Sequence, residues 1–159
     1  MQVFDASSMI HAWDNYPEPQ FPGLWSWLAF QLANNKLSIS TVAFDEVAAK
    51  TPECGIWLKN NHLQKLPITE AILQDALRIK GALGIVNDIY HPKGVGENDL
   101  FIIATARAYQ AELVSEEGRQ VKAPDTRSKR KIPSVCSMPE VNVSCINFTE
   151  LIKSSGEVF

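Results

Sequence analysis

Near its start the chain reads Gln2-Val3-Phe4-Asp5-Ala6-Ser7-Ser8-Met9-Ile10. The first residues form a short apolar run that ends in an acid, and Met9, Ile10 and Trp13 then recur at the spacing of one helix face. This stretch predicts a strand, a turn and a helix, with Asp5 at the carboxyl end of the strand. Sites in parallel sheets lie beyond these carboxyl ends, so Asp5 is the first candidate site residue.

The same alternation of strand and helix patterns continues along the chain. Residues 37–40 alternate like a strand, and a helix over 42–50 follows, with Thr41 as its expected N-cap. A second short apolar strand covers 112–115. Further helices are expected over 24–32, 55–61, 69–83, 97–109 and 148–154, and the apolar segments 132–136 and 141–146 complete the chain. The alternation predicts an α/β fold, a mostly parallel central sheet with helices on both faces.

Composition agrees with this fold class. The chain has 159 residues, 45% hydrophobic and 21% charged, which predicts one globular domain over residues 1–159 and excludes disorder, collagen and coiled coil. No apolar run approaches the roughly 18 residues that span a bilayer, and no basic signal segment is present. Cys54, Cys136 and Cys145 form no C-x-x-C pair, so neither a disulfide framework nor a zinc knuckle is indicated. We expect a soluble, unprocessed, cytoplasmic protein.

The net charge of −3 conceals an uneven distribution. Residues 118–133 carry six basic side chains and a single acid, whereas the rest of the chain is acidic. The six bases of this basic segment are Arg119, Lys122, Arg127, Lys129, Arg130 and Lys131. Such a run is either a solvated surface loop or an electrostatic contact for a polyanion.

Acids recur at comparable places in the expected elements. Asp5 ends the first strand, and Glu116 and Glu117 follow a later one. Asp99 lies in the first turn of the helix that leads into that later strand, and Glu46 lies one helical turn beyond another strand. Carboxylates that converge at one edge of a sheet repel each other unless cations lie between them. Hard oxygen ligands of this kind select Mg²⁺ or Mn²⁺ over zinc.

Together these segments resemble the PIN-domain nucleases, in particular the VapC-like ribonucleases that act as toxins in bacterial toxin–antitoxin pairs. Residues 3–10 are similar to the opening strand of the family, in which an Asp is followed two residues later by Ser or Thr. Residues 40–47 are similar to its second strand and helix, and residues 98–106 to its most recognisable segment. Residues 113–117 are similar to the strand end at which a hydroxyl residue precedes the fourth acid.

The resemblance implies a PIN-like three-layer sandwich and a site of four acids. The catalytic, metal-binding residues would be Asp5, Glu46, Asp99 and Glu117, and the supporting residues would be Ser7, Ser115 and Glu116. Most relatives carry Asp where this chain has Glu117, so either Glu117 or Glu116 faces the metal, and we favour Glu117. The segments 131–136 and 146–151 resemble a PIN-like subfamily known as a domain of unknown function.

The implied chemistry is hydrolysis of RNA phosphodiesters to 5′-phosphate and 3′-hydroxyl ends. One Mg²⁺ or Mn²⁺ ion would lower the pKa of the attacking water, and a second would stabilise the departing 3′ oxygen. The basic segment directly follows the fourth acid, where it would hold the RNA backbone and make binding sensitive to salt. Single-stranded or looped RNA is the expected substrate. The partners implied are a cognate antitoxin protein and a second copy of the chain.

Two other classes of function fit parts of the sequence. A phosphoryl-transfer enzyme or phosphatase would also use an Asp after the first strand, but Asp5-Ala6-Ser7 lacks the second Asp expected two residues on. A non-catalytic nucleic-acid or protein-binding module would need only the fold and the basic segment. Its affinity should survive removal of divalent cations and substitution of the acids.

Overall fold

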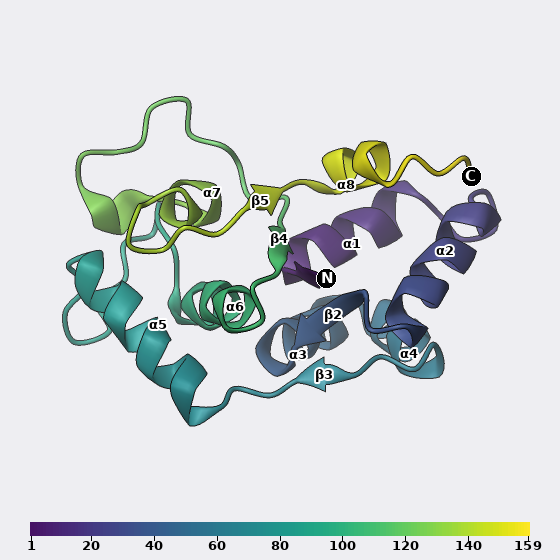
Figure 1. The fold of residues 1–159 in the computed structure, drawn as a ribbon, viewed down its shortest axis with the longest axis horizontal. Coiled ribbons are helices and arrows are strands. Elements are labelled where there is room, and N and C mark those ends of the chain that lie inside the picture. Colours follow the sequence, from purple (N-terminus) through teal and green to yellow (C-terminus); the bar gives the residue numbers. More distant parts are fainter.

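The computed structural model describes residues 1–159. Five strands form one sheet, in the order β3-β2-β1-β4-β5, and every neighbouring pair is parallel (Figure 1). The strands are β1 (Gln2–Phe4), β2 (Leu37–Ser40), β3 (Lys65–Leu66), β4 (Glu112–Val114) and β5 (Cys145–Ile146). Parallel strands require long crossover connections, and helices supply them here. The predicted α/β class is therefore confirmed.

Eight helices flank the sheet. They are α1 (Ala6–Asn15), α2 (Pro22–Ala33), α3 (Thr41–Lys50), α4 (Pro52–Asn60), α5 (Glu70–Ala82), α6 (Glu97–Ala108), α7 (Ile132–Cys136) and α8 (Phe148–Ser155), with a 3-10 turn, η1, at Arg127–Lys129. In Figure 1, α5, α6 and α7 gather at one end of the molecule and α2 and α4 at the other. Helix α6 contacts α5, α3 and β1, so it runs close to the centre of the sheet.

The register of the three central strands aligns their carboxyl ends. Phe4 of β1 is paired with Ile39 of β2 on one side and with Val114 of β4 on the other. The residues that follow these pairs, Asp5 and Ser115 among them, therefore emerge at one edge of the sheet. Because α1 and α3 begin directly after β1 and β2, their first turns lie at this edge as well.

Three local features differ from the sequence interpretation. The N-cap of α3 is Ser40 and not Thr41, because Ser40 has the extended backbone of a cap residue and its Oγ accepts a hydrogen bond from the Ala43 N–H at 3.2 Å. The two-residue strand β3 was not expected, since an edge strand so short shows no alternation of apolar side chains. Of the apolar segment 141–146, only Cys145 and Ile146 form a strand.

The hydrophobic core is one cluster of 38 buried residues. Its central strand β1 contributes Val3 and Phe4, both without solvent exposure, and the ring of Phe4 meets that of Phe148 of α8 edge-on at 6.2 Å. This contact fixes α8 beside the carboxyl end of β1. None of the helices has the length and apolar character needed to cross a membrane.

Candidate active site

Asp5 is held by two hydroxyl groups at the carboxyl end of β1. Its side chain is only 3% exposed. The Ser7 hydroxyl donates a hydrogen bond to its Oδ2 at 2.5 Å, and the Ser115 hydroxyl donates to the same oxygen at 2.9 Å. Ser7 belongs to α1, whereas Ser115 follows β4, so the pairing of β1 with β4 assembles this contact. No hydrogen bond in the structure uses Oδ1 of Asp5, which leaves that oxygen free for a ligand.

Burial and neighbouring acids act on Asp5 together. Burial raises the pKa of its carboxyl above the ordinary value, and the hydrogen bonds from Ser7 and Ser115 oppose that rise in part. The negative charges of Glu46 and Glu117 raise the pKa of Asp5 further. Two acids from other elements thus lie near enough to Asp5 to disfavour its charged form.

Asp99 lies in the first turn of α6, where it caps its own helix. Its Oδ2 accepts a hydrogen bond from the Gly96 N–H at 2.8 Å. Burial raises the pKa of Asp99 to about 6, against the stabilising contact with Gly96, and the charges of Asp5, Glu117 and Glu46 add to the rise. The three other acids named from the sequence therefore lie near enough to Asp99 for their charges to raise its pKa.

Glu46 lies on α3 and faces the first turn of α6 across a small hollow. The hollow has a volume of about 290 Å³ and only polar walls, formed by Glu46, Gly96, Glu97, Asn98 and Asp99. Oε1 of Glu46 accepts a hydrogen bond from the ammonium group of Lys50 at 2.7 Å, one helical turn further along α3. Asp45, the neighbouring acid, is exposed and has no ion-pair partner.

The two acids after β4 have different surroundings. Oε1 of Glu116 accepts a hydrogen bond from the Phe148 N–H at the start of α8, at 2.6 Å, and its Oε2 lies 4.0 Å from Nδ1 of His11. The backbone N–H of Glu117 donates to the Ser115 hydroxyl, and its carboxylate acts on the pKa values of both Asp5 and Asp99. Glu116 is thus occupied by a structural contact, while the charge of Glu117 acts on Asp5 and Asp99.

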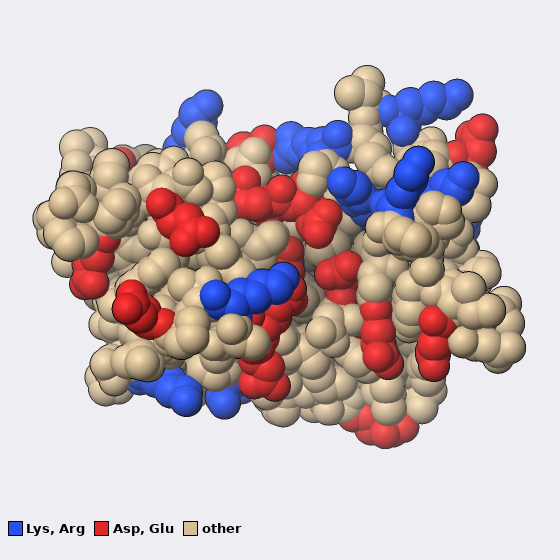
Figure 2. Space-filling model, turned by 180° about the vertical axis from the view of Figure 1, so that it is seen from behind, with Lys and Arg blue, Asp and Glu red and all other residues tan.

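These four carboxylates, Asp5, Glu46, Asp99 and Glu117, are called the acid group below. Acidic side chains gather across the middle of the face shown in Figure 2. The members of the acid group interact through their charges, but no three His, Cys, Asp or Glu side chains are drawn together tightly enough to form a metal site. The donor set nonetheless fits Mg²⁺ or Mn²⁺, because it consists of carboxylate oxygens and includes the unpaired Oδ1 of buried Asp5.

Some side chains of the basic segment already have partners within the molecule. Arg119 pairs with Glu150 and Arg127 with Glu140, each at 2.5 Å, and Arg130 donates to the Pro124 carbonyl. Three lysines of the segment have no ion-pair partner: Lys122, Lys129 and Lys131. Basic side chains cluster in the upper right of Figure 2, where the connection between β4 and α7 passes beside the acidic face.

Sequence reasoning missed Lys50. Its signal is the spacing of four residues from Glu46, which places both side chains on one face of a helix. The spacing alone does not identify Lys50 as a site residue, because the same arrangement is common on exposed helix surfaces. The packing of α3 against α6 is what brings Lys50 near Asp99.

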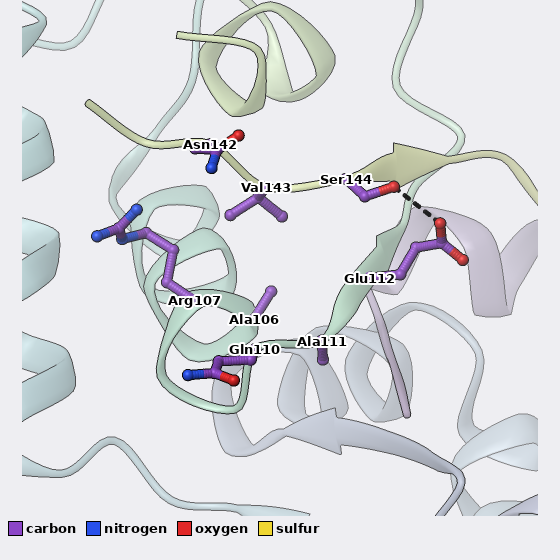
Figure 3. Close-up of a pocket in the computed structure, with 8 residues that line it drawn as sticks. All are labelled: Ala106, Arg107, Gln110, Ala111, Glu112, Asn142, Val143 and Ser144. Carbon is purple, nitrogen blue, oxygen red and sulfur yellow. Dashed lines mark hydrogen bonds between the residues drawn. The ribbon is translucent and has the colours of Figure 1, made fainter. Parts of the chain in front are cut away.

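A larger hollow of about 480 Å³ lies away from the acid group, at the opposite edge of the sheet (Figure 3). It is formed by the end of α6, the start of β4 and the segment before β5. Three of its polar side chains are already paired, since Arg107 bonds to Asp75 at 2.7 Å and the Ser144 hydroxyl donates to Glu112 at 2.8 Å. None of the site residues named from the sequence lines this hollow.

Comparisons with known proteins agree with the fold. A family model described as a domain of unknown function, DUF4411, matches residues 2–159. No curated protein matches the chain in sequence. A chain in the crystal structure of VapBC2 from Rickettsia felis, bound to a DNA fragment from their promoter, is 17% identical, with 92% of this chain and 98% of that chain covered and a TM-score of 0.58.

A chain in the structure of FitAcB from Neisseria gonorrhoeae is likewise 17% identical, with 92% of this chain and 97% of that chain covered and a TM-score of 0.55. A third, in the structure of FitAB bound to the IR36 DNA fragment, is 16% identical, with 92% and 94% covered and a TM-score of 0.53. At these identities the likeness establishes a shared fold. The resemblance to VapC-like proteins is therefore confirmed at the level of the fold.

Proposed function

The chain belongs to the DUF4411 family, a domain of unknown function, and from its site we propose that it is a metal-dependent endoribonuclease, the toxin of a toxin–antitoxin pair. The observation that carries the proposal is that Glu46 and Glu117, from two other parts of the chain, lie close enough to raise the pKa values of both Asp5 and Asp99. The similarity in fold to chains of VapBC2 and FitAB supports it.

The electrostatics of the acid group favour a cation. Asp5 is buried, and its hydrogen-bonding partners are uncharged hydroxyls, so nothing bonded to it neutralises its charge. Asp99 has a raised pKa, first because it is buried and further because the charges of three other acids act on it. A divalent cation placed among these carboxylates would remove their mutual repulsion. Such an arrangement costs the protein free energy unless a ligand offsets it, which is typical of functional sites.

The roles of the residues follow from their positions. Asp5 and Asp99 would bind the metal directly, Glu46 would bind it or orient the attacking water, and Glu117 would serve a second metal or an outer-shell role. When bound, the metal supplies activation of water and stabilisation of the charge that develops on the phosphodiester. Ser7 and Ser115 hold the Asp5 carboxylate in one orientation, so that its free Oδ1 points to a fixed place.

The partners proposed are RNA, an antitoxin protein and a second copy of the chain. Lys122, Lys129 and Lys131 form no ion pair, and their ammonium groups would contact phosphates of a single strand without reading its bases. The DNA-bound complexes named VapBC2 and FitAB support the antitoxin proposal by fold similarity.

A non-catalytic binding module on the same fold is the second candidate. The ion pair between Glu46 and Lys50 favours it, because a lysine already satisfies one acid of the group. The two candidates differ in their need for metal, since a binding module holds RNA equally well without Mg²⁺ or Mn²⁺.

The test is cleavage of a mixed pool of labelled RNAs by the purified chain, with Mn²⁺, with Mg²⁺ and with EDTA, alongside Asp99→Asn and Asp45→Asn. Asp99→Asn keeps an oxygen that can accept from the Gly96 N–H, so α6 retains its cap. We expect metal-dependent cutting that falls at least about a hundredfold in Asp99→Asn, the loss typical of a key electrostatic group, and persists in Asp45→Asn. Metal-independent RNA binding without any cutting would instead establish the binding module.

A further inference from the structure

Lys50 is the only base that forms an ion pair with a member of the acid group. Its ammonium nitrogen lies 2.7 Å from Oε1 of Glu46, with the Lys50 side chain 62% exposed and the Glu46 side chain 30% exposed. The ion pairs of the structure include none with Asp5, Asp99 or Glu117. Taken alone, a Glu-to-Lys pair one helical turn apart is a common surface contact of small free energy.

The place of this pair distinguishes it from an ordinary surface contact. Glu46 lines the polar hollow of about 290 Å³ that Asp99 lines from the opposite side. The pKa of Lys50 is raised, first by its hydrogen bond to Glu46 and then by the charges of Glu46, Asp5 and Asp99. The ammonium group of Lys50 is therefore attracted by acids from three different parts of the chain. A cation bound in the hollow would be attracted by the same acids.

We propose that Lys50 is a positioning residue that holds Glu46 in the metal-free site and competes with the divalent cation for that carboxylate, thereby setting the affinity of the site for metal. The proposal rests on the function proposed above. One carboxylate cannot at once retain its short contact with the ammonium group and give its full charge to a metal. Removal of the ammonium group leaves a more negative hollow, and a divalent cation binds more tightly there.

The test is Mn²⁺ binding to the full chain, followed by electron paramagnetic resonance of the free ion, in the native protein, Lys50→Met and Lys50→Arg. Lys36→Met is the matched control, because Lys36 precedes β2 at the other edge of the sheet. We expect Lys50→Met to bind Mn²⁺ about fivefold more tightly, in line with the loss of one ion pair. Lys50→Arg and Lys36→Met should bind as the native protein does.

Thermal unfolding gives a second readout that does not depend on RNA. In EDTA, Lys50→Met should unfold at a lower temperature than the native protein, because the acid group loses its counter-charge. Addition of Mn²⁺ should then raise the unfolding temperature of Lys50→Met by more than it raises that of the native protein. Neither effect is expected for Lys36→Met.

The outcomes separate this inference from the proposed function. Equal Mn²⁺ affinity in native protein and Lys50→Met overturns the role of Lys50 and leaves the nuclease standing. The expected gain in Mn²⁺ affinity, together with a failure to cut any RNA, supports the role of Lys50 and overturns the nuclease. Absence of Mn²⁺ binding in both proteins overturns both.

Discussion

Glu116 and Glu117 are adjacent in the sequence, yet they make different contacts and have different roles. Glu116 accepts the Phe148 N–H at the positive end of α8, whereas Glu117 repels Asp5 and Asp99. We predict that Glu116→Ala lowers the free energy of unfolding by about 1–2 kcal/mol, the cost of losing a charged acceptor at a helix N-terminus. Glu117→Ala should leave it unchanged or raise it slightly.

Urea unfolding in EDTA measures both variants under one condition. The result that matters is which of the two variants, Glu116→Ala or Glu117→Ala, loses more free energy of unfolding. A larger loss in Glu117→Ala than in Glu116→Ala would show that Glu117 bears the structural contact. It would also return Glu116 to the acid group as the fourth acid, which was the other possibility left open by the sequence.

The raised pKa of Asp99 predicts that the free energy of unfolding depends on pH. Its pKa is raised from 3.8 in the unfolded chain to about 6 in the folded chain. Between these values the folded state binds more protons than the unfolded state, so the contribution of Asp99 to the free energy of unfolding falls as the pH rises through this interval. The full difference is at most about 3 kcal/mol.

Asp99→Asn removes this contribution while it keeps the cap of α6. In EDTA we therefore expect Asp99→Asn to be more stable than the native protein at neutral pH, with the advantage shrinking below about pH 6 and vanishing near pH 4. Denaturant unfolding across this pH range measures it. An advantage that does not change with pH would show that the Asp99 carboxyl titrates normally in the folded protein.

At the scale of elements, α3 depends on the residue that begins it. Ser40 has no solvent exposure, and its hydroxyl caps the helix that carries Glu46 and Lys50. Ser40→Ala should lower the free energy of unfolding by about 1 kcal/mol, the usual value of an N-cap. Thr41→Ala is the matched control, because Thr41 is the first helical residue and caps nothing.

Urea unfolding of the two variants checks this assignment. If Thr41→Ala proved the more destabilising, the cap would lie where the sequence pattern had placed it. The pattern could not separate the two positions, since Ser and Thr are both good N-caps and are adjacent here. The distinction comes from the pairing of β2 with β3, in which Ser40 is paired with Leu66 and so keeps the strand conformation.

At the scale of the whole molecule, basic side chains lie beside acidic side chains on the face shown in Figure 2. Replacement of the three unpaired lysines, Lys122, Lys129 and Lys131, by Gln should weaken RNA binding. It should also reduce the slope of the logarithm of affinity against the logarithm of salt concentration by about 2, since each contact to single-stranded RNA contributes about 0.7. Lys36, Lys59 and Lys153, replaced together by Gln, form the control.

Fluorescence anisotropy of a labelled RNA at several salt concentrations measures this slope. An unchanged slope in the first variant, or an equal fall in the control, would identify the basic segment as a solvated loop. Arg119 and Arg127 are left out of the substitution because their loss would also break ion pairs with Glu150 and Glu140.

The sequence by itself determined the order of the strands and helices, except for the short edge strand β3 and helix α7, and it marked candidate acids near the strand ends. Both are local properties: the spacing of apolar side chains within a short segment distinguishes strand from helix, and an acid such as Asp5 is recognised by its place after the apolar run. The α/β class followed from the alternation of these segments. Candidate acids could be named because the carboxyl ends of parallel strands meet at one edge, and the resemblance to PIN-domain nucleases implied the set of four with Glu117.

The tertiary structure alone decided how these residues are partnered. Ser115 reaches Asp5 across 110 residues of chain, and Glu116 reaches the Phe148 N–H across 32. The pairing of Arg119 with Glu150 and the approach of Lys50 to Asp99 also join separate elements. Such contacts depend on strand register and helix packing, because neighbouring side chains at a strand end point in different directions that no local pattern encodes.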